Sequence, residues 1–322
     1  MPESQALRRP GPTAQAPPEL RPAVVFHALV KRYRGDVGVR GVDLEIAGRQ
    51  VFALVGPNGA GKTTLLNLLC DLIEPDAGTV TVTGRPALCP DAAEFEPWLT
   101  GSEVVRQSFA LARPGERLDP GRYDEVVDGT GVRAFARRRC GGYSRGMTQR
   151  LGIAAALILD PDVLVLDEPT SALDPVARAD MLSLIRRLGT RRTVVLSSHT
   201  LADVQRVADT IAVMDAGRLL FTGPPRVLID EHLRPAWRVT LTHDAGPVVG
   251  VLSGHAAVRD VRRRGVDEFD IEFRTVAKGA ELLVGLLAEV GARVSSLVPV
   301  DADLESAFLA LTGRDRRRED ER

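Results

Sequence analysis

The sequence predicts an α/β fold with a mostly parallel sheet, followed by a small α+β domain. A glycine-rich stretch, GPNGAGKTT, stands between the strand-like run VFALV and the helix-like run TLLNLLCDLI. Two further apolar runs, VLVL and TVVLSS, show no polar alternation, which is typical of parallel strands buried on both faces. After about residue 235 the apolar residues alternate with polar ones or recur at helical spacing, as in half-solvated strands and amphipathic helices.

The composition is that of a globular protein with no basic surface for nucleic acid. The chain has 322 residues, of which 44% are hydrophobic, and a formal net charge of -1. Binding to a phosphate backbone would need a basic stripe, so we expect no nucleic-acid partner. The three cysteines form no CxxC pair and predict reduced thiols rather than a zinc site. No apolar run reaches the roughly 18 residues of a membrane span, and the N-terminus lacks a signal-peptide core, so we expect a cytoplasmic protein.

Four segments are expected along the chain. Residues 1–22 are rich in Pro and Ala and predict a disordered leader. Residues 23–230 carry the alternating strands and helices of the α/β domain. Residues 235–312 are expected to form an accessory α+β domain with helices at AELLVGLLAEV and LESAFLALT, and residues 313–322 are expected to be a charged tail that frays.

The stretch GPNGAGKTT has the features of a phosphate-binding loop. It follows a strand and opens a helix, so its glycines let successive backbone N–H groups point at phosphate oxygens at a helix N-terminus. Lys62 is expected to reach the β- and γ-phosphates, and the hydroxyl of Thr63 to bind Mg²⁺. The alternative is an ordinary glycine turn, but four matching positions would occur by chance on the order of once in a hundred chains of this length.

A pair of carboxylates follows the apolar run VLVL, within DEPTSALDP. Asp167 ends the predicted strand and can hold Mg²⁺, while the adjacent Glu168 can accept a proton from an attacking water. An isolated acidic turn after a core strand is common, but this one lies downstream of a phosphate loop. A GTPase would also need an NKxD-type guanine reader, which the sequence lacks.

A histidine follows the third predicted buried strand, in TVVLSSHT. His199 lies at the carboxyl end of that strand, the edge of an α/β sheet where ligands bind. A histidine in this position can donate to a γ-phosphate and orient the water that Glu168 activates. Taken alone, such a histidine is more often structural, and the other four histidines have no comparable context.

In this order, the motifs of residues 23 to about 225 resemble the nucleotide-binding subunit of an ATP-binding-cassette (ABC) transporter. GPNGAGKT, YSRGM, VLVLDEP, SALD and SSH match that family's Walker A, signature, Walker B, D-loop and switch-histidine motifs. The resemblance implies a P-loop NTPase of the ABC ATPase type with a helical signature subdomain. It also implies ATP and Mg²⁺ as cofactors, with nucleotide-binding residues at Tyr33, Gly56, Asn58, Gly59, Ala60, Gly61, Lys62, Thr63 and Thr64.

The resemblance also implies a composite ATP site. In this family two subunits pair head to tail, so Ser144 and Gly146 would contact the γ-phosphate bound by the partner, and Asp174 would lie at the dimer seam. A serine at a helix start suits this role, although it can equally serve as a plain N-cap. Tyr33 would stack on adenine, although a tyrosine at the end of a strand can be simple packing.

Two departures from the family pattern stand out. Arg145 and Met147 occupy signature positions where the family often has Gly and Gln, which is a familiar variant. In PALCPDAAEFEPWLTG, Asp91 falls where the family has its Q-loop glutamine. We expect this shorter, charged side chain to serve as a further Mg²⁺ ligand, the alternative being that Asp91 only caps a loop and that Thr63 and Asp167 hold the metal alone.

Within the family, YSRGM followed by QR, and a tail that reads DLESAFLALTGR, resemble the subgroup that powers multidrug and antibiotic exporters. The sequence therefore predicts an ATPase that energises a separate membrane permease and sits on the inner face of the membrane through it. One alternative is an ABC ATPase acting on ribosomes or DNA, but those carry two cassettes or a long coiled coil. Another is a non-hydrolysing cassette, which would have lost Lys62 or Glu168.

Overall fold

The computed structural model describes residues 22–33, 38–300 and 303–320, and for 314–320 it describes the backbone only. The predicted leader therefore lies almost entirely outside the described residues. At the other end, the charged tail at 313–322 is expected to fray, whereas the backbone of its described residues 313–320 continues helix α10 (Leu304–Asp320).

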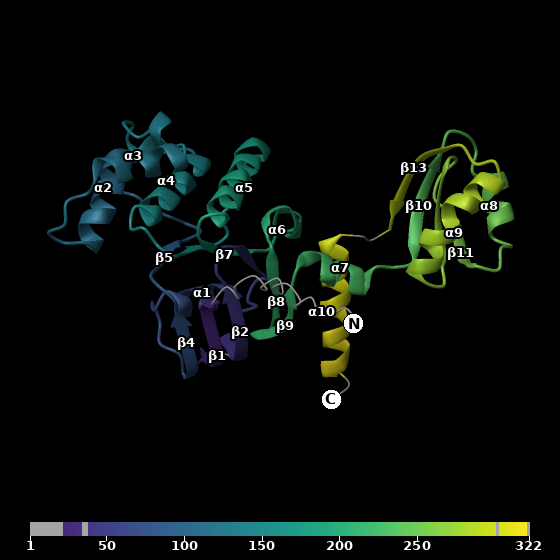
Figure 1. The fold of residues 1–322 in the computed structure, drawn as a ribbon, viewed down its shortest axis with the longest axis horizontal. Helices are drawn as coiled ribbons and strands as arrows, with labels where there is room; N and C mark the ends of the chain where they lie inside the picture. The colour runs from purple at the N-terminus through teal and green to yellow at the C-terminus, as the bar shows by residue number, and fades with distance from the viewer. Residues whose placement is uncertain (1–21, 34–37, 301–302, 321–322) are drawn as a thin grey trace, which may run out of the picture.

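A six-stranded sheet with the order β5-β6-β7-β3-β8-β9 forms the centre of the α/β domain (Figure 1). All neighbours are parallel except β8 and β9, which form an antiparallel hairpin. The carboxyl ends of β3, β5, β6 and β7 therefore meet at one edge of the sheet. The strands span Val51–Val55 (β3), Pro86–Cys89 (β5), Val163–Leu166 (β6), Thr193–Ser198 (β7), Thr210–Asp215 (β8) and Arg218–Gly223 (β9).

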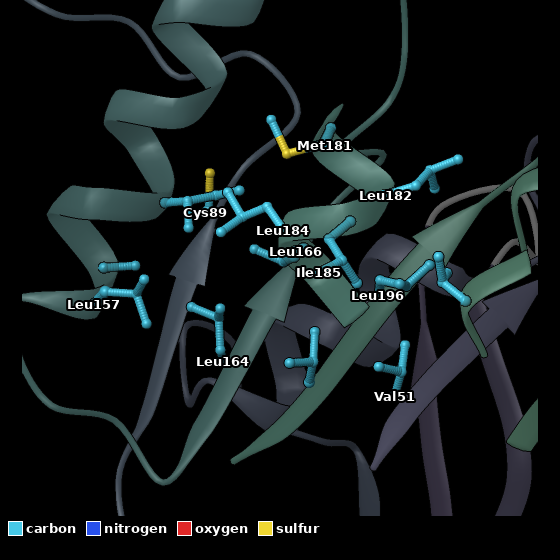
Figure 2. Packing of buried hydrophobic residues seen from close by; sticks show 14 of the residues in the cluster. Val51, Cys89, Leu157, Leu164, Leu166, Met181, Leu182, Leu184, Ile185 and Leu196 are labelled. Carbon is cyan, nitrogen blue, oxygen red and sulfur yellow. The ribbon is translucent and has the colours of Figure 1, made fainter. Parts of the chain in front are cut away.

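Alternate residues of these strands face two different cores. On one face Leu164, Leu166 and Leu196 pack against helices, and Figure 2 shows them beside Met181 and Ile185 of α5. This continuous burial explains why VLVL and TVVLSS carry no polar alternation. The helices on this face include α5 (Pro175–Gly189), α6 (Leu201–Val207) and α7 (Pro225–His232).

The opposite face of the sheet packs against α1 and a second, antiparallel sheet of order β2-β1-β4. Phe52 and Leu54 of β3 point into this core, where they meet Phe26 and Leu65. Helix α1 is thus held directly behind the phosphate loop. These elements span Pro22–Arg32 (β1), Gly38–Ala47 (β2), Ala77–Val82 (β4) and Lys62–Leu69 (α1).

A helical unit is inserted between β5 and β6 and lies beyond the end of the sheet in Figure 1. Its first helix starts at a capping box, in which Thr100 and Glu103 satisfy each other's backbone amides. Its last helix begins after Ser144 and runs back to the sheet. The helices span Gly101–Ala112 (α2), Pro120–Gly129 (α3) and Arg145–Leu157 (α4), with 3-10 turns at Val132–Ala134 and Cys140–Gly142.

The C-terminal part holds a four-stranded antiparallel sheet of order β11-β12-β10-β13 with its own core. Phe269, Ile271 and Phe273 alternate along one strand and face the helices, and Trp237 meets Phe273 edge to face at 5.7 Å. The alternation seen in WRVTLT and FDIEF thus reflects one buried face. The elements span Ala236–Leu241 (β10), Gly246–Leu252 (α8), Val258–Arg263 (β11), Glu268–Phe273 (β12), Val276–Glu289 (α9) and Val294–Pro299 (β13).

Helix α10 differs from the expectation that residues 235–312 form one accessory domain. Its buried residues Leu304 and Ala307 belong to the core of the α/β domain, together with Leu228 of α7, and Figure 1 shows α10 lying against α7. The backbone amide of Leu304 also donates to Gln205 Oε1 of α6, at 3.2 Å. The chain therefore leaves the α/β domain after α7, forms the small sheet, and returns.

Among the described residues, no helix combines the length and the apolar character that crossing a membrane would require.

Candidate functional site

The phosphate loop joins the end of β3 to the start of α1 at the carboxyl edge of the sheet. Gly59 and Gly61 have φ values of 82° and 98°, in the left-handed region that favours glycine. A Cβ at Gly61 would lie 2.7 Å from the carbonyl oxygen of Gly38, so no side chain fits there. The loop can therefore turn its backbone amides toward the N-terminus of α1, where an anion is stabilised.

Lys62 is the buried cation of this loop. Its Nζ donates to the carbonyl oxygens of Gly56 and Pro57 at 2.7 and 3.1 Å, and the residue is only 7% exposed. Burial lowers the pKa of the Lys62 ammonium below its ordinary value, and the negative charges of Glu168 and Asp167 oppose that shift. An incoming phosphate would supply the anion that the buried ammonium lacks among its direct contacts.

The other predicted loop residues differ in exposure. Asn58, Gly59 and Thr63 are exposed on the solvent side of the loop, while Ala60 and Gly61 are buried against the domain. Tyr33, directly after β1, has 46% of its surface exposed, so its ring is available for stacking.

Hard oxygen donors meet next to the loop. The hydroxyl of Thr63 lies 3.1 Å from Asp167 Oδ2, and Asp167 Oδ1 accepts a hydrogen bond from Ser197. Within the described residues no cluster of three or more His, Cys, Asp or Glu could hold a metal. The hydroxyl of Thr63 and the carboxylate of Asp167 fit Mg²⁺, which is usually bound by one or two protein oxygens, by substrate phosphates and by several waters.

Glu168 and His199 come together from the ends of two adjacent strands. His199 Nδ1 lies 2.8 Å from Glu168 Oε2, and the two side chains are 54% and 16% exposed. The backbone of Glu168 has φ 45°, a conformation that residues other than glycine rarely adopt. The carboxylate is thus held at the sheet edge with one oxygen engaged by the imidazole, in reach of solvent.

Sequence reasoning missed Ser197, although it stands in the SSH motif that was singled out for its histidine. The Ser197 side chain is buried in β7; it donates to Asp167 Oδ1 and accepts from the backbone amide of Glu168 at 2.9 Å. A single hydroxyl therefore binds the carboxylate of Asp167 and the backbone of Glu168. The sequence does carry a signal for Ser197, since a polar residue at the end of a fully buried strand must find hydrogen-bond partners there.

Ser144 caps helix α4, with its Oγ accepting from the amide of Met147 at 3.3 Å. This is the plain capping role that the sequence left open, and it leaves a helix N-terminus at the surface. A Cβ at Gly146 would lie 3.3 Å from Ala177 and 3.8 Å from Leu173, so α4 passes close to the start of α5. Asp174 caps α5, accepting from the amides of Val176 and Ala177 at 3.0 Å each.

Asp91 has a partner different from the expected metal. Its Oδ1 accepts from Arg145 Nη2 at 2.6 Å, and the same nitrogen donates to the Asp91 backbone oxygen at 2.7 Å. The contacts of this carboxylate thus run to the signature helix, whereas those of Asp167 run to Thr63 and Ser197. The sequence favours Asp91 as a further Mg²⁺ ligand beside Asp167, with an Asp91 that only caps a loop as the alternative.

A largely parallel sheet, a phosphate loop at its carboxyl edge after β3 and carboxylates at the same edge after β6 define a P-loop nucleoside triphosphate hydrolase. Residues 39–171 match the family model described as ABC transporter. The daunorubicin resistance ATP-binding protein DrrA3 of Streptomyces coeruleorubidus is 33% identical over 316 residues, covering 92% of this chain and 97% of the relative. The chain therefore belongs to the ABC transporter family, as one of its ATP-binding, ATP-hydrolysing proteins.

Other comparisons agree with this assignment. Nod factor export ATP-binding protein I of Rhizobium sp. (strain N33) is 31% identical over 89% of this chain and 96% of the relative. A solved ATP-binding subunit of an ABC transporter has a TM-score of 0.57 at 23% identity, covering 65% of this chain and 92% of that chain. A dimeric ATP-binding cassette in a post-hydrolysis state, bound to ADP and Pi, has a TM-score of 0.56 at 22% identity over 62% and 98%. At these identities, the solved structures confirm the fold.

Proposed function

We propose that this protein hydrolyses ATP to power export through a separate membrane permease, and that two copies close head to tail around two ATP molecules. The observation that carries the proposal is the division of the site within one chain. Lys62, Thr63, Asp167 and Glu168 gather at the carboxyl edge of the sheet, whereas Ser144 opens a helix on the inserted unit. The contacts of that helix start run to α5 and to the loop after β5.

The direction of transport follows from the relatives. Proteins named for daunorubicin resistance and for Nod factor export match 92% and 89% of this chain, so the similarity extends beyond the α/β domain into the C-terminal part. We infer an exporter whose substrate is selected by the permease, and a place for this subunit on the cytoplasmic face of the membrane.

Each residue of the site then has a distinct task. The amides at the start of α1 and the Lys62 ammonium bind the phosphates, and Tyr33 stacks on the adenine. Thr63 and Asp167 would hold Mg²⁺, which neutralises phosphate charge. Glu168 accepts a proton from the attacking water, and His199 orients the Glu168 side chain. Ser197 holds the Asp167 carboxylate and the backbone of Glu168. The partner's helix start at Ser144 completes the enclosure of the γ-phosphate.

Mixing two inactive variants tests the composite site. Lys62→Ala disables the phosphate loop of its own chain, and Ser144→Arg blocks the helix start that serves the partner. Each variant alone should hydrolyse almost no ATP. In a mixed dimer both defects fall on one site and leave the other intact, so ATPase activity should return on mixing.

The control is a mixture of each variant with an inert protein at equal concentration, which should restore nothing. If mixing restores no activity although mixed dimers form, each chain holds a self-contained site, and the head-to-tail proposal is wrong.

A further inference from the structure

Arg145 links the signature helix to the loop that follows β5. It is the first residue of α4, directly after the Ser144 cap, and its Nη2 contacts both the carboxylate and the backbone oxygen of Asp91. The two side chains are 37% and 44% exposed, so the pair is partly screened by solvent. Two hydrogen bonds from one nitrogen fix where the loop stands relative to the helix start.

Close packing lies beneath this pair. The Sγ of Cys89, the last residue of β5, lies 3.8 Å from Gln149 Nε2, and a Cβ at Gly152 would approach it to 2.8 Å. The Cys89 carbonyl oxygen accepts from the backbone amide of Asp167 at 3.0 Å. A continuous chain of contacts therefore runs from the backbone of Asp167 through β5 and Asp91 to the first turn of α4.

The Arg145 guanidinium and the Asp91 carboxylate neutralise each other's charge. A cation in the first turn of a helix is unfavourable because the helix N-terminus already carries partial positive charge, and the Asp91 carboxylate neutralises the Arg145 guanidinium there. Without Arg145, the Asp91 carboxylate would instead be an unpaired negative charge in the loop after β5. The two departures from the family pattern thus form a single interaction.

We propose that Arg145 is a positioning residue: its pair with Asp91 holds the N-terminus of α4 against the strand that adjoins Asp167, and so sets how readily the partner's ATP is enclosed. This inference rests on the proposed head-to-tail function. It assigns Asp91 to the signature helix rather than to the metal.

The experiment uses the full chain with Glu168→Gln as the parent, so that ATP is bound but not hydrolysed. Asp91→Asn, Arg145→Gln and the double variant are each titrated with MgATP, and dimer formation is followed by analytical ultracentrifugation. Each single variant should need about threefold to tenfold more ATP for half-maximal dimer, because one charged hydrogen-bonding partner is left unpaired. The double variant should need less ATP than either single, since no unpaired charge remains.

Two controls separate positioning from general damage. Binding of a fluorescent ATP analogue to the monomer should be unchanged in all three variants, because the phosphate loop is intact. Asp180→Asn, which removes the ion pair of Arg150 on the same helix, should leave the dimer titration where it was. A shift for Asp180→Asn equal to that of Asp91→Asn would overturn the specific role of Arg145.

The remaining outcomes are distinct. Additive effects in the double variant would show that Asp91 and Arg145 act independently and would overturn the inference. A Mg²⁺ requirement for ATPase activity that rises in Asp91→Asn, with Glu168 intact, would assign Asp91 to the metal and also overturn it. If the Glu168→Gln parent itself stays monomeric with MgATP, the composite site is wrong, and the proposed function fails together with the inference.

Discussion

The carboxylate of Glu168 and the imidazole of His199 face one another at the edge of the central sheet, with Oε2 and Nδ1 2.8 Å apart. Glu168 is held there in a left-handed backbone conformation, which costs on the order of 1–3 kcal/mol for a residue other than glycine. The hydroxyl of Ser197 accepts from the Glu168 amide and helps to retain that conformation. Such local strain is typical of functional positions.

Glu168→Gln should lower ATP hydrolysis by at least roughly 100-fold, because glutamine has a similar shape but cannot accept the proton. Binding of ATP should remain, since the phosphate loop is untouched. Phosphate release and equilibrium nucleotide binding measure the two effects, and Glu116→Gln, which changes an exposed glutamate, serves as the control. Turnover near the wild-type rate would show that another group is the base.

If His199 acts through Glu168, its loss should matter less once Glu168 is gone. His199→Ala alone should slow hydrolysis, but the double variant His199→Ala with Glu168→Gln should be no slower than Glu168→Gln, because residues that act as one unit are not additive. Steady-state rates of the four proteins form the cycle. A further loss in the double variant would give His199 an independent role at the phosphate.

Ser197→Ala should lower the turnover number of ATP hydrolysis with a smaller effect on the Michaelis constant for ATP. The substitution leaves the Glu168 amide and Asp167 Oδ1 without their shared buried partner, which costs about 1–3 kcal/mol. The matched control is Ser198→Ala, whose hydroxyl accepts from the Thr200 amide instead. Equal kinetics for the two alanine variants would contradict the orienting role of Ser197.

Helix α10 should contribute to the stability of the α/β domain. Leu304 is 1% exposed in the core of that domain, so Leu304→Ala should lower the free energy of unfolding by about 2–5 kcal/mol. Leu309 lies on the same helix and is 63% exposed, so Leu309→Ala should change it by less than about 0.5 kcal/mol. Denaturant titrations, with bound nucleotide as the reporter, compare the free energies of unfolding of the two variants. Equal losses for Leu304→Ala and Leu309→Ala would place α10 outside that core.

The C-terminal sheet should lose stability in acid through Asp270. Burial would raise the pKa of this carboxyl, but hydrogen bonds from Arg238 and Arg264 outweigh that effect and hold the pKa below its usual value of 3.8. A lowered folded-state pKa stabilises the fold above the unfolded-state pKa, and this contribution disappears as the pH falls through the folded-state value.

Asp270→Asn should therefore destabilise the sheet by about 1–3 kcal/mol at neutral pH, and the difference from wild type should shrink below about pH 4. Fluorescence of Trp237, buried in that core, reports its unfolding, measured in a Trp98→Phe background because Trp98 is exposed. The control is Asp267→Asn on the exposed turn before the strand. A difference that stays constant down to pH 2 would contradict the role of the Asp270 charge.

The sequence by itself determined the α/β fold and the phosphate chemistry of this protein. A phosphate loop is contiguous in the chain, and its glycines, Lys62 and Thr63 carry their meaning in their spacing. Buried parallel strands must also deliver their carboxyl ends to one edge of the sheet, so the order of the strands and motifs along the chain suffices to predict Asp167, Glu168 and His199 at that edge.

Only the tertiary structure decided the partners of individual side chains. The sequence shows that α10 has an apolar face. Helical periodicity indicates that such a face is buried, but it does not identify the element against which the face packs. It therefore does not predict the return of α10 to the α/β domain. The sequence likewise does not predict that Asp91 pairs with Arg145, which is 54 residues away. Nor does it predict that the hydroxyl of Ser197 bridges Asp167 and Glu168. Such contacts join segments that are distant in the chain, and distances of a few tenths of an ångström, set by packing, decide which of several chemically suitable partners a polar group meets.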